Sequence, residues 1–245
     1  MSDPHAPIRP FYMTLPSPCP YLPGQTEQRV VAEMRRRGDD EVFNHLSEAG
    51  FRRSMGWLYR PACPTCQACV PVRIPAASFN WTRNFRKIVN RNNDVTWSEG
   101  PATYDAEHFA LFRRYIASRH GDGGMASMGE AEYREMLENA PSNTVLVSFR
   151  DSENRLVAAS ITDRMRNGLS GVYKYFDPDE ERRSLGTYAI LWHVRRCIEL
   201  EVDHVYLGYW IANCRKMSYK TRFRPLERMS REGWVSFESE DEAGS

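Results

Sequence analysis

The stretch GVYKYFDPDEERRSLGTYAILW, residues 171–192, decides the fold class because it joins the end of a strand to the start of a long helix. The strand ends at YFDP, and the helix begins near Ser184. Backbone N–H groups at a helix N-terminus suit an anion such as a phosphate, and Arg182 and Arg183 add positive charge there. Ser184 also fits the N-cap position of the helix.

The elements around this stretch give an α+β order. Segments with helical spacing precede three strand patterns, and a long helix and a further strand follow, at residues 103–121, 129–141, 143–151, 155–165, 168–178, 184–201 and 203–211. This is the element order of an N-acetyltransferase-like fold. That fold usually carries a glycine-rich coenzyme A loop before the long helix, but the stretch DPDEERRSLGT has one glycine. We therefore expect a donor other than coenzyme A.

The N-terminal part is expected to be a smaller, cysteine-containing half. Thr26 is a plausible N-cap for a first helix, and the segments 51–61 and 69–79 read as two paired strands with a cysteine-rich turn between them. A single final strand is expected over 225–237. The predicted units are an N-terminal domain at 1–100, a transferase domain at 101–238 and an acidic tail at 239–245.

Three cysteines stand in the C-x2-C-x2-C spacing of YRPACPTCQACVPVRIP, residues 59–75. Such spacing supplies three thiolate ligands in a tight turn, and a four-coordinate zinc or an iron–sulfur cluster needs a fourth. Cys19, in the proline-rich N-terminal arm, is the candidate for it. The predicted metal ligands are therefore Cys19, Cys63, Cys66 and Cys69, and the alternative is that some of these thiols are simply buried.

The overall composition indicates a soluble globular protein and gives no information about its binding partners. The 245 residues are 41% hydrophobic and 27% charged, with a net charge of +1, which is ordinary for a soluble globular protein. The N-terminus lacks the pattern of a signal peptide, and no stretch approaches 18 apolar residues. We expect a cytoplasmic protein that does not enter a membrane, in which clustered cysteines are metal ligands or catalytic groups more often than disulfides.

Positive charge is concentrated locally. Residues 211–225 hold five basic residues and no acidic one, and residues 29–91 hold twelve basic against five acidic residues. Aromatic side chains are interleaved with these charges. This pattern favours nucleic-acid backbone contacts with base stacking, and the alternative is a pair of solvated basic faces.

Four motifs carry a resemblance to a known family: CPYLPGQ, GFRRSMGWLYRPACPTCQACVPVRIP, YKYFDPDEERRSLGTYAILWHV and YLGYWIANCRKMSYKTRFRPLE. The chain resembles the aminoacyl-tRNA–protein transferases of the N-end rule pathway, and within them the bacterial aspartate/glutamate leucyltransferases. The resemblance implies transfer of leucine from leucyl-tRNA to proteins that begin with Asp or Glu, which marks them for degradation. The residues themselves leave leucine or arginine open as the donor.

Aminolysis of an aminoacyl ester requires no cofactor chemistry. The enzyme holds amine and ester together, stabilises the tetrahedral oxyanion and takes up a proton. Residues proposed for the chemistry are Tyr173, Lys174, Asp177, Tyr209 and Asn213. Candidates for binding the acceptor carboxylate are Arg52, Arg53 and Arg73, because a guanidinium suits a carboxylate. Candidates for contacts with the charged tRNA and its ester are Arg183, Ser184, Lys216, Tyr219 and Lys220.

Two rival functions fit parts of these patterns. One is a small-molecule N-acyltransferase that uses coenzyme A, and the missing glycine-rich loop counts against it. The other is a non-catalytic, zinc-containing RNA-binding protein, and the long transferase-like half counts against that.

Overall fold

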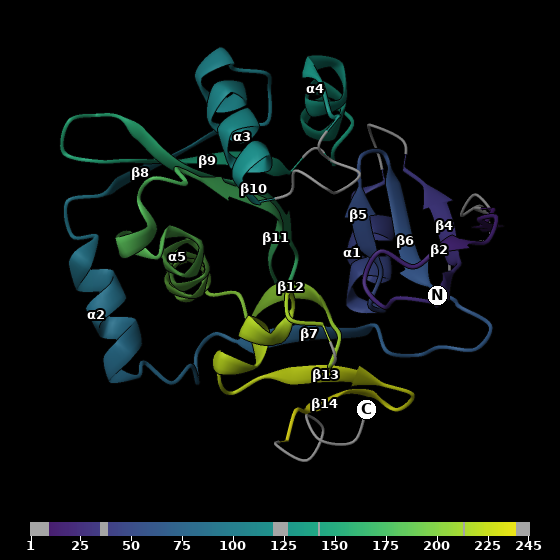
Figure 1. Ribbon diagram of the computed structural model, residues 1–245. Helices are drawn as coiled ribbons and strands as arrows, with labels where there is room; N and C mark the ends of the chain where they lie inside the picture. The colour runs from purple at the N-terminus through teal and green to yellow at the C-terminus, as the bar shows by residue number, and fades with distance from the viewer. Residues whose placement is uncertain (1–9, 35–38, 120–126, 142, 213, 239–245) are drawn as a thin grey trace.

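The computed structural model describes residues 10–34, 39–119, 127–141, 143–212 and 214–238, and it contains a large sheet flanked by helices and a smaller sheet beside it (Figure 1). The predicted acidic tail, 239–245, lies outside these residues. The large sheet has eight strands in the order β14-β13-β7-β12-β11-β10-β9-β8. Its strands are β7 Val70–Pro75, β8 Thr96–Pro101, β9 Thr144–Arg150, β10 Leu156–Met165, β11 Gly168–Phe176, β12 His204–Trp210, β13 Glu227–Ser230 and β14 Gly233–Ser236.

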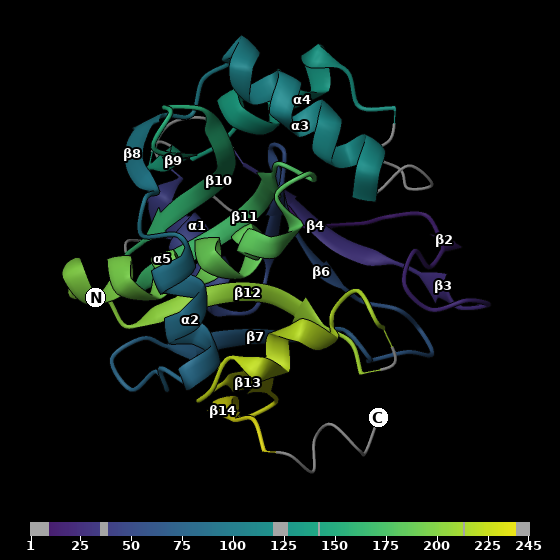
Figure 2. The ribbon, with the colours of Figure 1, turned by 60° about the vertical axis from the view of Figure 1, so that its left-hand side comes forward.

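Helices cover both faces of the large sheet (Figure 2). One face is packed by α3 and α4, and the other by α2 and α5, with separate apolar clusters under each pair. Consecutive side chains of β9 point to opposite faces of the sheet: Leu146 belongs to the cluster under α3 and α4, and Val147 to the cluster under α2 and α5. The helices are α2 Arg83–Arg91, α3 Ala106–Arg119, α4 Glu130–Glu138 and α5 Leu185–Glu199.

The predicted α+β order is confirmed from residue 103 onward. Two helices, three antiparallel strands, a long helix and a further strand follow one another as the periodicity indicated. The turn after β11 contains a short 3-10 helix, η1 Glu181–Arg183, which leads directly into α5. A second, η2 Ser218–Arg222, follows β12.

The smaller sheet has four strands in the order β1-β4-β6-β5, with α1 Asp40–Glu48 packed beside it. Its strands are β1 Tyr12–Met13, β4 Arg29–Glu33, β5 Arg52–Ser54 and β6 Trp57–Pro61. A separate two-stranded ladder joins β2 Ser17–Pro18 and β3 Thr26–Glu27. The apolar cluster under this half also contains Met165 and Tyr206 from the large sheet, so the two halves share buried surface.

Three expectations for local structure were wrong. Residues 26–33 form the strands β3 and β4 rather than a helix, because pairing of β4 with both β1 and β6 outweighs local helix propensity. The segments on either side of the cysteines do not pair: β6 lies in the small sheet, whereas β7 pairs with β12 and β13. The last segment, 225–237, is a hairpin of β13 and β14 rather than one strand.

A buried ion pair ties the two sheets together. Arg53 of β5 and Asp163 of β10 are 1% and 0% exposed at their side chains, and two guanidinium nitrogens of Arg53 donate to the two carboxylate oxygens at 2.9 and 3.1 Å. Thr144 donates a further hydrogen bond to Asp163, and the carbonyls of Met55 and Met136 accept from Arg53. Such bidentate geometry fixes orientation as well as distance.

Replacing Arg53 with Met should destabilise the protein by about 3–5 kcal/mol, because the carboxylate of Asp163 would stay buried without its cation. The double variant Arg53→Met/Asp163→Asn should recover part of that loss. The control is Arg60→Met, whose exposed guanidinium donates to the carbonyl of Ala49, and it should change stability by less than about 0.5 kcal/mol. Urea unfolding measures all three, and a loss below about 1 kcal/mol for Arg53→Met would contradict this role.

Candidate active site

The site forms where β11 and β12 separate. The two strands pair in parallel at three positions, the last of which is Ser170 with Tyr206. Two residues later, Gly208 has a φ of +80°, and the register of β12 with β7 shifts between Tyr206 and Gly208. The guanidinium of Arg52 lies against this turn, since a Cβ on Gly208 would be 3.1 Å from its Nε. Glycine is therefore required at 208 both for the backbone conformation and for the space.

Three positive side chains converge here, and we call Arg52, Lys174 and Lys220 the cationic cluster. They come from β5, β11 and η2, so all three distant segments must fold to bring them together. Their hydrogen bonds go to neutral groups: Arg52 to Ser170 Oγ at 3.1 Å, Lys174 to the Gly171 carbonyl at 3.4 Å, and Lys220 to the Tyr209 carbonyl.

Burial and mutual repulsion act on both lysines of the cluster. Burial, followed by the charge of Arg52, lowers the pKa of Lys174 to about 8. Burial lowers the pKa of Lys220 well below its usual range, and both Arg52 and Lys174 add to this effect. The charge of Arg52 thus acts on both lysines, and that of Lys174 acts on Lys220.

A buried histidine forms the floor beside Lys174. Nδ1 of His193 donates to the Ala189 carbonyl at 2.6 Å, so its Nε2 accepts from the hydroxyl of Thr162 at 2.9 Å. Burial and the charge of Lys174 lower the pKa of His193 to about 3, which keeps the ring neutral. Gly171 leaves room for the ammonium group, because any Cβ at that position would overlap Lys174 Nζ.

The three arginines predicted to bind the acceptor have different surroundings. Arg53 is used by the junction with Asp163, and Arg73 is bound by Glu227 at 2.6 Å and lies 4.3 Å over the ring of Trp234. Arg52 makes no ion pair within the described residues. These contacts favour Arg52 as the arginine that is available to a ligand.

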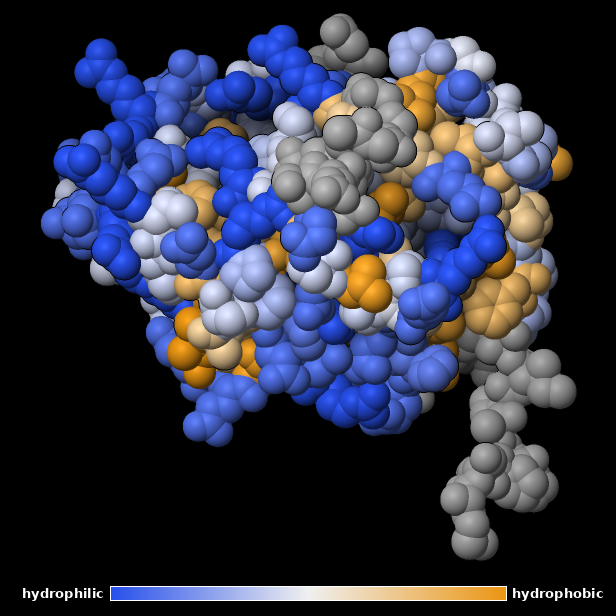
Figure 3. Space-filling model, turned by 90° about the horizontal axis from the view of Figure 1, so that it is seen from below, coloured by the Kyte–Doolittle hydropathy of each residue, from blue (hydrophilic) through white to orange (hydrophobic). Residues whose placement is uncertain are grey.

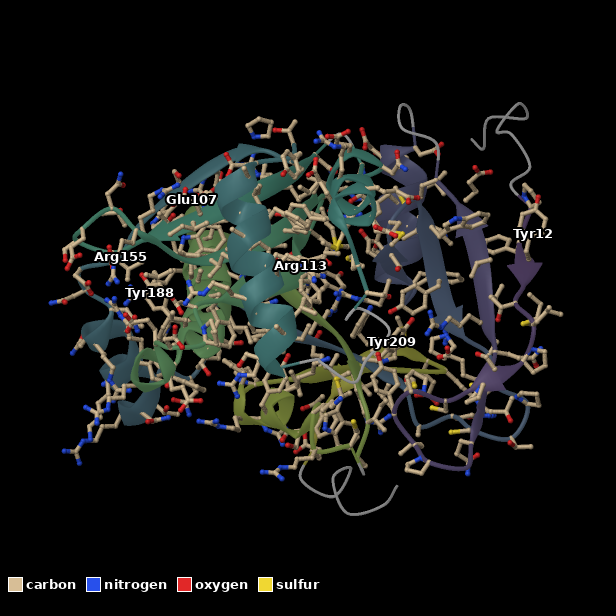
Figure 4. The ribbon with its side chains drawn as sticks, turned by 45° about the horizontal axis from the view of Figure 1, so that its top comes forward. Tyr12, Glu107, Arg113, Arg155, Tyr188 and Tyr209 are labelled. Carbon is tan, nitrogen blue, oxygen red and sulfur yellow. The ribbon has the colours of Figure 1, made fainter. Side chains whose placement is uncertain are left out.

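The groups proposed for the chemistry also differ in their contacts. Asp177 is bound by Arg114 at 2.7 Å and accepts from the N–H of Asp179, which suits a turn more than proton transfer. The hydroxyl of Tyr209 points to the carbonyls of Gly50 and Tyr59, at 2.9 and 3.1 Å, where β12 meets the small half (Figure 4). The hydroxyl of Tyr173 is buried and has no partner among the described groups. Asn213 lies outside the described residues.

The residues predicted to contact the tRNA are dispersed. Arg183 is bound by Asp94 and Asn92. Ser184 has a positive φ of 54° at the start of α5, and its side chain makes no capping hydrogen bond. Lys216 and Tyr219 are exposed, whereas Lys220 is 4% exposed and belongs to the cationic cluster.

Sequence reasoning missed Gly171, Gly208 and His193, which shape the site without carrying its charge. One signal was available for Gly208, because an isolated glycine inside a strand pattern often marks a bulge or a close approach.

The four predicted cysteine ligands line one pocket of about 630 Å³, together with parts of β3, β6, β7 and β13. Burial, followed by the negative charge of the neighbouring Cys19, Cys63 and Cys66 thiolates, raises the pKa of Cys69 to about 12. No group of three or more His, Cys, Asp or Glu side chains is arranged to hold a metal ion in the part of the chain that the structure describes. Among the same residues, no helix is both long and apolar enough to cross a membrane.

Comparison with protein families identifies both halves of the chain. Residues 17–87 match the N-terminal and residues 107–230 the C-terminal family model described as arginine-tRNA-protein transferase. The chain belongs to this family. It is thus an aminoacyltransferase whose substrates are a charged tRNA and a protein. The predicted domain boundary at residue 100 stays a prediction. Strand β7, from the predicted N-terminal domain, belongs to the same sheet as β12 of the predicted transferase domain.

Full-length relatives support the same family. The chain is 48% identical to the aspartate/glutamate leucyltransferase of Paramagnetospirillum magneticum, over 95% of this chain and 96% of that protein. It is 45% identical to the protein of the same name from Rhodospirillum rubrum, over 96% of both chains.

A solved structure of L-PGS from Bacillus licheniformis aligns with 74% of this chain and 52% of its own, at 13% identity and a TM-score of 0.44.

The lowered pKa of Lys174 predicts a pH-dependent effect on stability. An unfolded lysine has a pKa of about 10.4, so between pH 8 and 10.4 the unfolded chain binds a proton that the folded chain has released. Below pH 8 the folded protein carries the full cost of the charged side chain. Lys174→Met should therefore raise the melting temperature at pH 7 by at least about 2 °C, and the gain should shrink as the pH approaches 10.4.

The matched control is Lys87→Met, which removes an exposed lysine from α2 and should show no such pH-dependent gain. Thermal unfolding at several pH values makes the comparison. A lower melting temperature for Lys174→Met at pH 7, or a difference that does not change with pH, would contradict the assignment.

Proposed function

We propose that this protein transfers leucine from leucyl-tRNA to the N-terminal α-amine of proteins that begin with Asp or Glu, and so marks them for degradation by the N-end rule. The observation that carries the proposal is the match over nearly the whole chain to relatives that bear the name aspartate/glutamate leucyltransferase. The cationic cluster supports it, because an acceptor of this kind brings a negative charge into the site. The proposal includes a cytoplasmic location, where charged tRNA is found.

The reaction joins an amine to an activated ester, and the enzyme contributes mainly position and charge. An α-amine has a pKa of about 7.7–8.0, so part of it is neutral and nucleophilic near pH 7. The hydroxyl of Tyr173, which has no partner among the described groups and packs beside Phe112 and Tyr115 of α3, is our candidate for a hydrogen bond to the tetrahedral oxyanion. Asp177 and Tyr209 remain candidates for proton transfer, although their present partners occupy them.

Exposed basic side chains mark the surface proposed for the tRNA. Arg215, Lys216 and Arg222 follow β12, and Arg83, Arg86 and Lys87 lie on α2, all exposed and without a carboxylate partner in the described ranges. Seen from below, the side of the molecule that carries α2 is strongly hydrophilic (Figure 3). We expect contacts to phosphates and sugars rather than to bases, since double-stranded RNA is recognised largely by shape and backbone.

The direct test of function is a transfer assay with purified protein, radiolabelled leucyl- or arginyl-tRNA, and peptides that differ only in their first residue. Label from leucyl-tRNA should reach peptides that begin with Asp or Glu, and peptides that begin with Ala should stay unlabelled. Transfer from arginyl-tRNA alone would assign the donor of the alternative arginyltransferase. No transfer from either tRNA to any peptide would refute the proposal.

We also propose that the pocket lined by Cys19, Cys63, Cys66 and Cys69 binds zinc or an iron–sulfur cluster as a structural or regulatory site. Four thiols around one pocket provide the number and type of ligands that both groups need, and they would have to move closer together to bind either one. Aminolysis of an activated ester needs position and charge rather than redox chemistry, so we assign this site a structural or regulatory role.

Removing one of these ligands should lower both metal content and stability. We expect Cys66→Ser and Cys69→Ser each to reduce bound zinc or iron and to lower the melting temperature. Cys197→Ala, at a buried cysteine outside the pocket, should keep the metal. The measurement is elemental analysis of anaerobically purified protein, and the absence of both zinc and iron from the wild type would end the hypothesis.

A further inference from the structure

The cationic cluster differs from other buried and half-buried positive charges of this protein in its binding partners. Arg53, Arg73 and Arg183 each bind a carboxylate of the protein itself. Arg52, Lys174 and Lys220 instead donate to a hydroxyl and two carbonyls, and no Asp or Glu of the described ranges forms an ion pair with them. Three like charges that are close and partly buried raise the free energy of the folded state, and an anion between them would lower it.

We infer that the cationic cluster binds the side-chain carboxylate of the acceptor's first residue and thereby selects Asp and Glu over Asn and Gln. This inference rests on the proposed function. It differs from the expectation for the sequence in two respects: Arg53 and Arg73 have no part in it, and two lysines from the other half of the protein do.

The chemistry of the cluster matches a carboxylate. The planar guanidinium of Arg52 can donate two parallel hydrogen bonds to the two oxygens of a carboxylate. An amide of Asn or Gln has one acceptor oxygen, carries no charge, and would place its own N–H groups against the cations. Preference for the acid therefore follows from charge and from the number of acceptors, without a contact to the rest of the side chain.

Burial favours a peptide side chain over a tRNA phosphate as the anion. Lys220 is only 4% exposed, and the cluster lies next to the last paired residues of β11 and β12. A backbone phosphate carries a ribose on either side and needs an open surface, whereas the first side chain of a peptide is free at its end and can reach a buried cation. Exposed cations such as Arg215 and Lys216 are better placed for phosphates.

The depth of the cluster also predicts a large effect of each charge. A hydrogen bond to a charged group contributes about 1.5–3 kcal/mol, which corresponds to about a 10- to 100-fold change in efficiency. Removal of one member should therefore cost about 10- to 100-fold in transfer to Asp and Glu peptides. It should cost much less with Asn and Gln peptides, which do not use the charge.

The test compares Arg52→Gln, Lys174→Gln and Lys220→Gln with the wild type at saturating leucyl-tRNA. For each protein, kcat/KM is measured with peptides that begin with Asp, Glu, Asn and Gln, and the quantity compared is the Asp-to-Asn ratio within one variant. A variant that folds poorly loses activity with every peptide, so this ratio does not depend on the folded fraction. We expect the ratio to fall at least about tenfold in each variant, and less in Arg52→Lys, which keeps the charge.

The matched control is Arg166→Gln, which removes an exposed guanidinium that is bound by Glu41 and Glu48. Its Asp-to-Asn ratio should stay within about twofold of the wild type. If the three cluster variants keep the wild-type ratio, or lose Asp and Asn transfer equally, the inference is overturned although the proposed function stands.

A second measurement separates the inference from the proposed function. Binding of a fluorescent peptide that begins with Asp is followed by anisotropy without any tRNA. Tighter binding by the wild type than by Arg52→Gln, with no such difference for the Asn peptide, supports the inference even if leucine is not the donor. Equal binding of the Asp peptide by both proteins overturns it.

Discussion

The structure depends on one buried ion pair, Arg53 with Asp163. Two hydrogen bonds between them fix the middle of β5 against the C-terminal end of β10, and Thr144 holds the carboxylate from a third strand. Because Arg52 precedes Arg53 on β5, its side chain is directed by the same anchor. An ion pair outside the cationic cluster therefore positions one of the cluster's members.

The cationic cluster illustrates a conflict between stability and function. Its two lysines have lowered pKa values because they are buried and lie near the charge of Arg52, and each would be more stable in water. Proteins commonly retain such unfavourable arrangements where a ligand needs them. In this account the ligand is a carboxylate of the acceptor, so the site is most stable when a substrate is bound.

Periodicity in the sequence predicted the transferase-like half well and the N-terminal half poorly. From β9 to β12 each element has a clear local pattern, and the structure confirms the order. Thr26 to Glu33 has a local pattern that fits a helix, but pairing with β6 makes it strand, and nothing local reveals that partner. The same limit applied to the site. Sequence named Arg52, Lys174 and Lys220 for separate roles, and only the fold shows that the end of the β11–β12 ladder brings them together.

The most direct test of the account is an experimental structure of the protein with a bound peptide that begins with Asp. We expect the side-chain carboxylate to lie about 3 Å from the guanidinium of Arg52 and close to the ammonium groups of Lys174 and Lys220. A peptide whose first carboxylate contacts other residues, with the cationic cluster still unpaired or occupied by a tRNA phosphate, would contradict it.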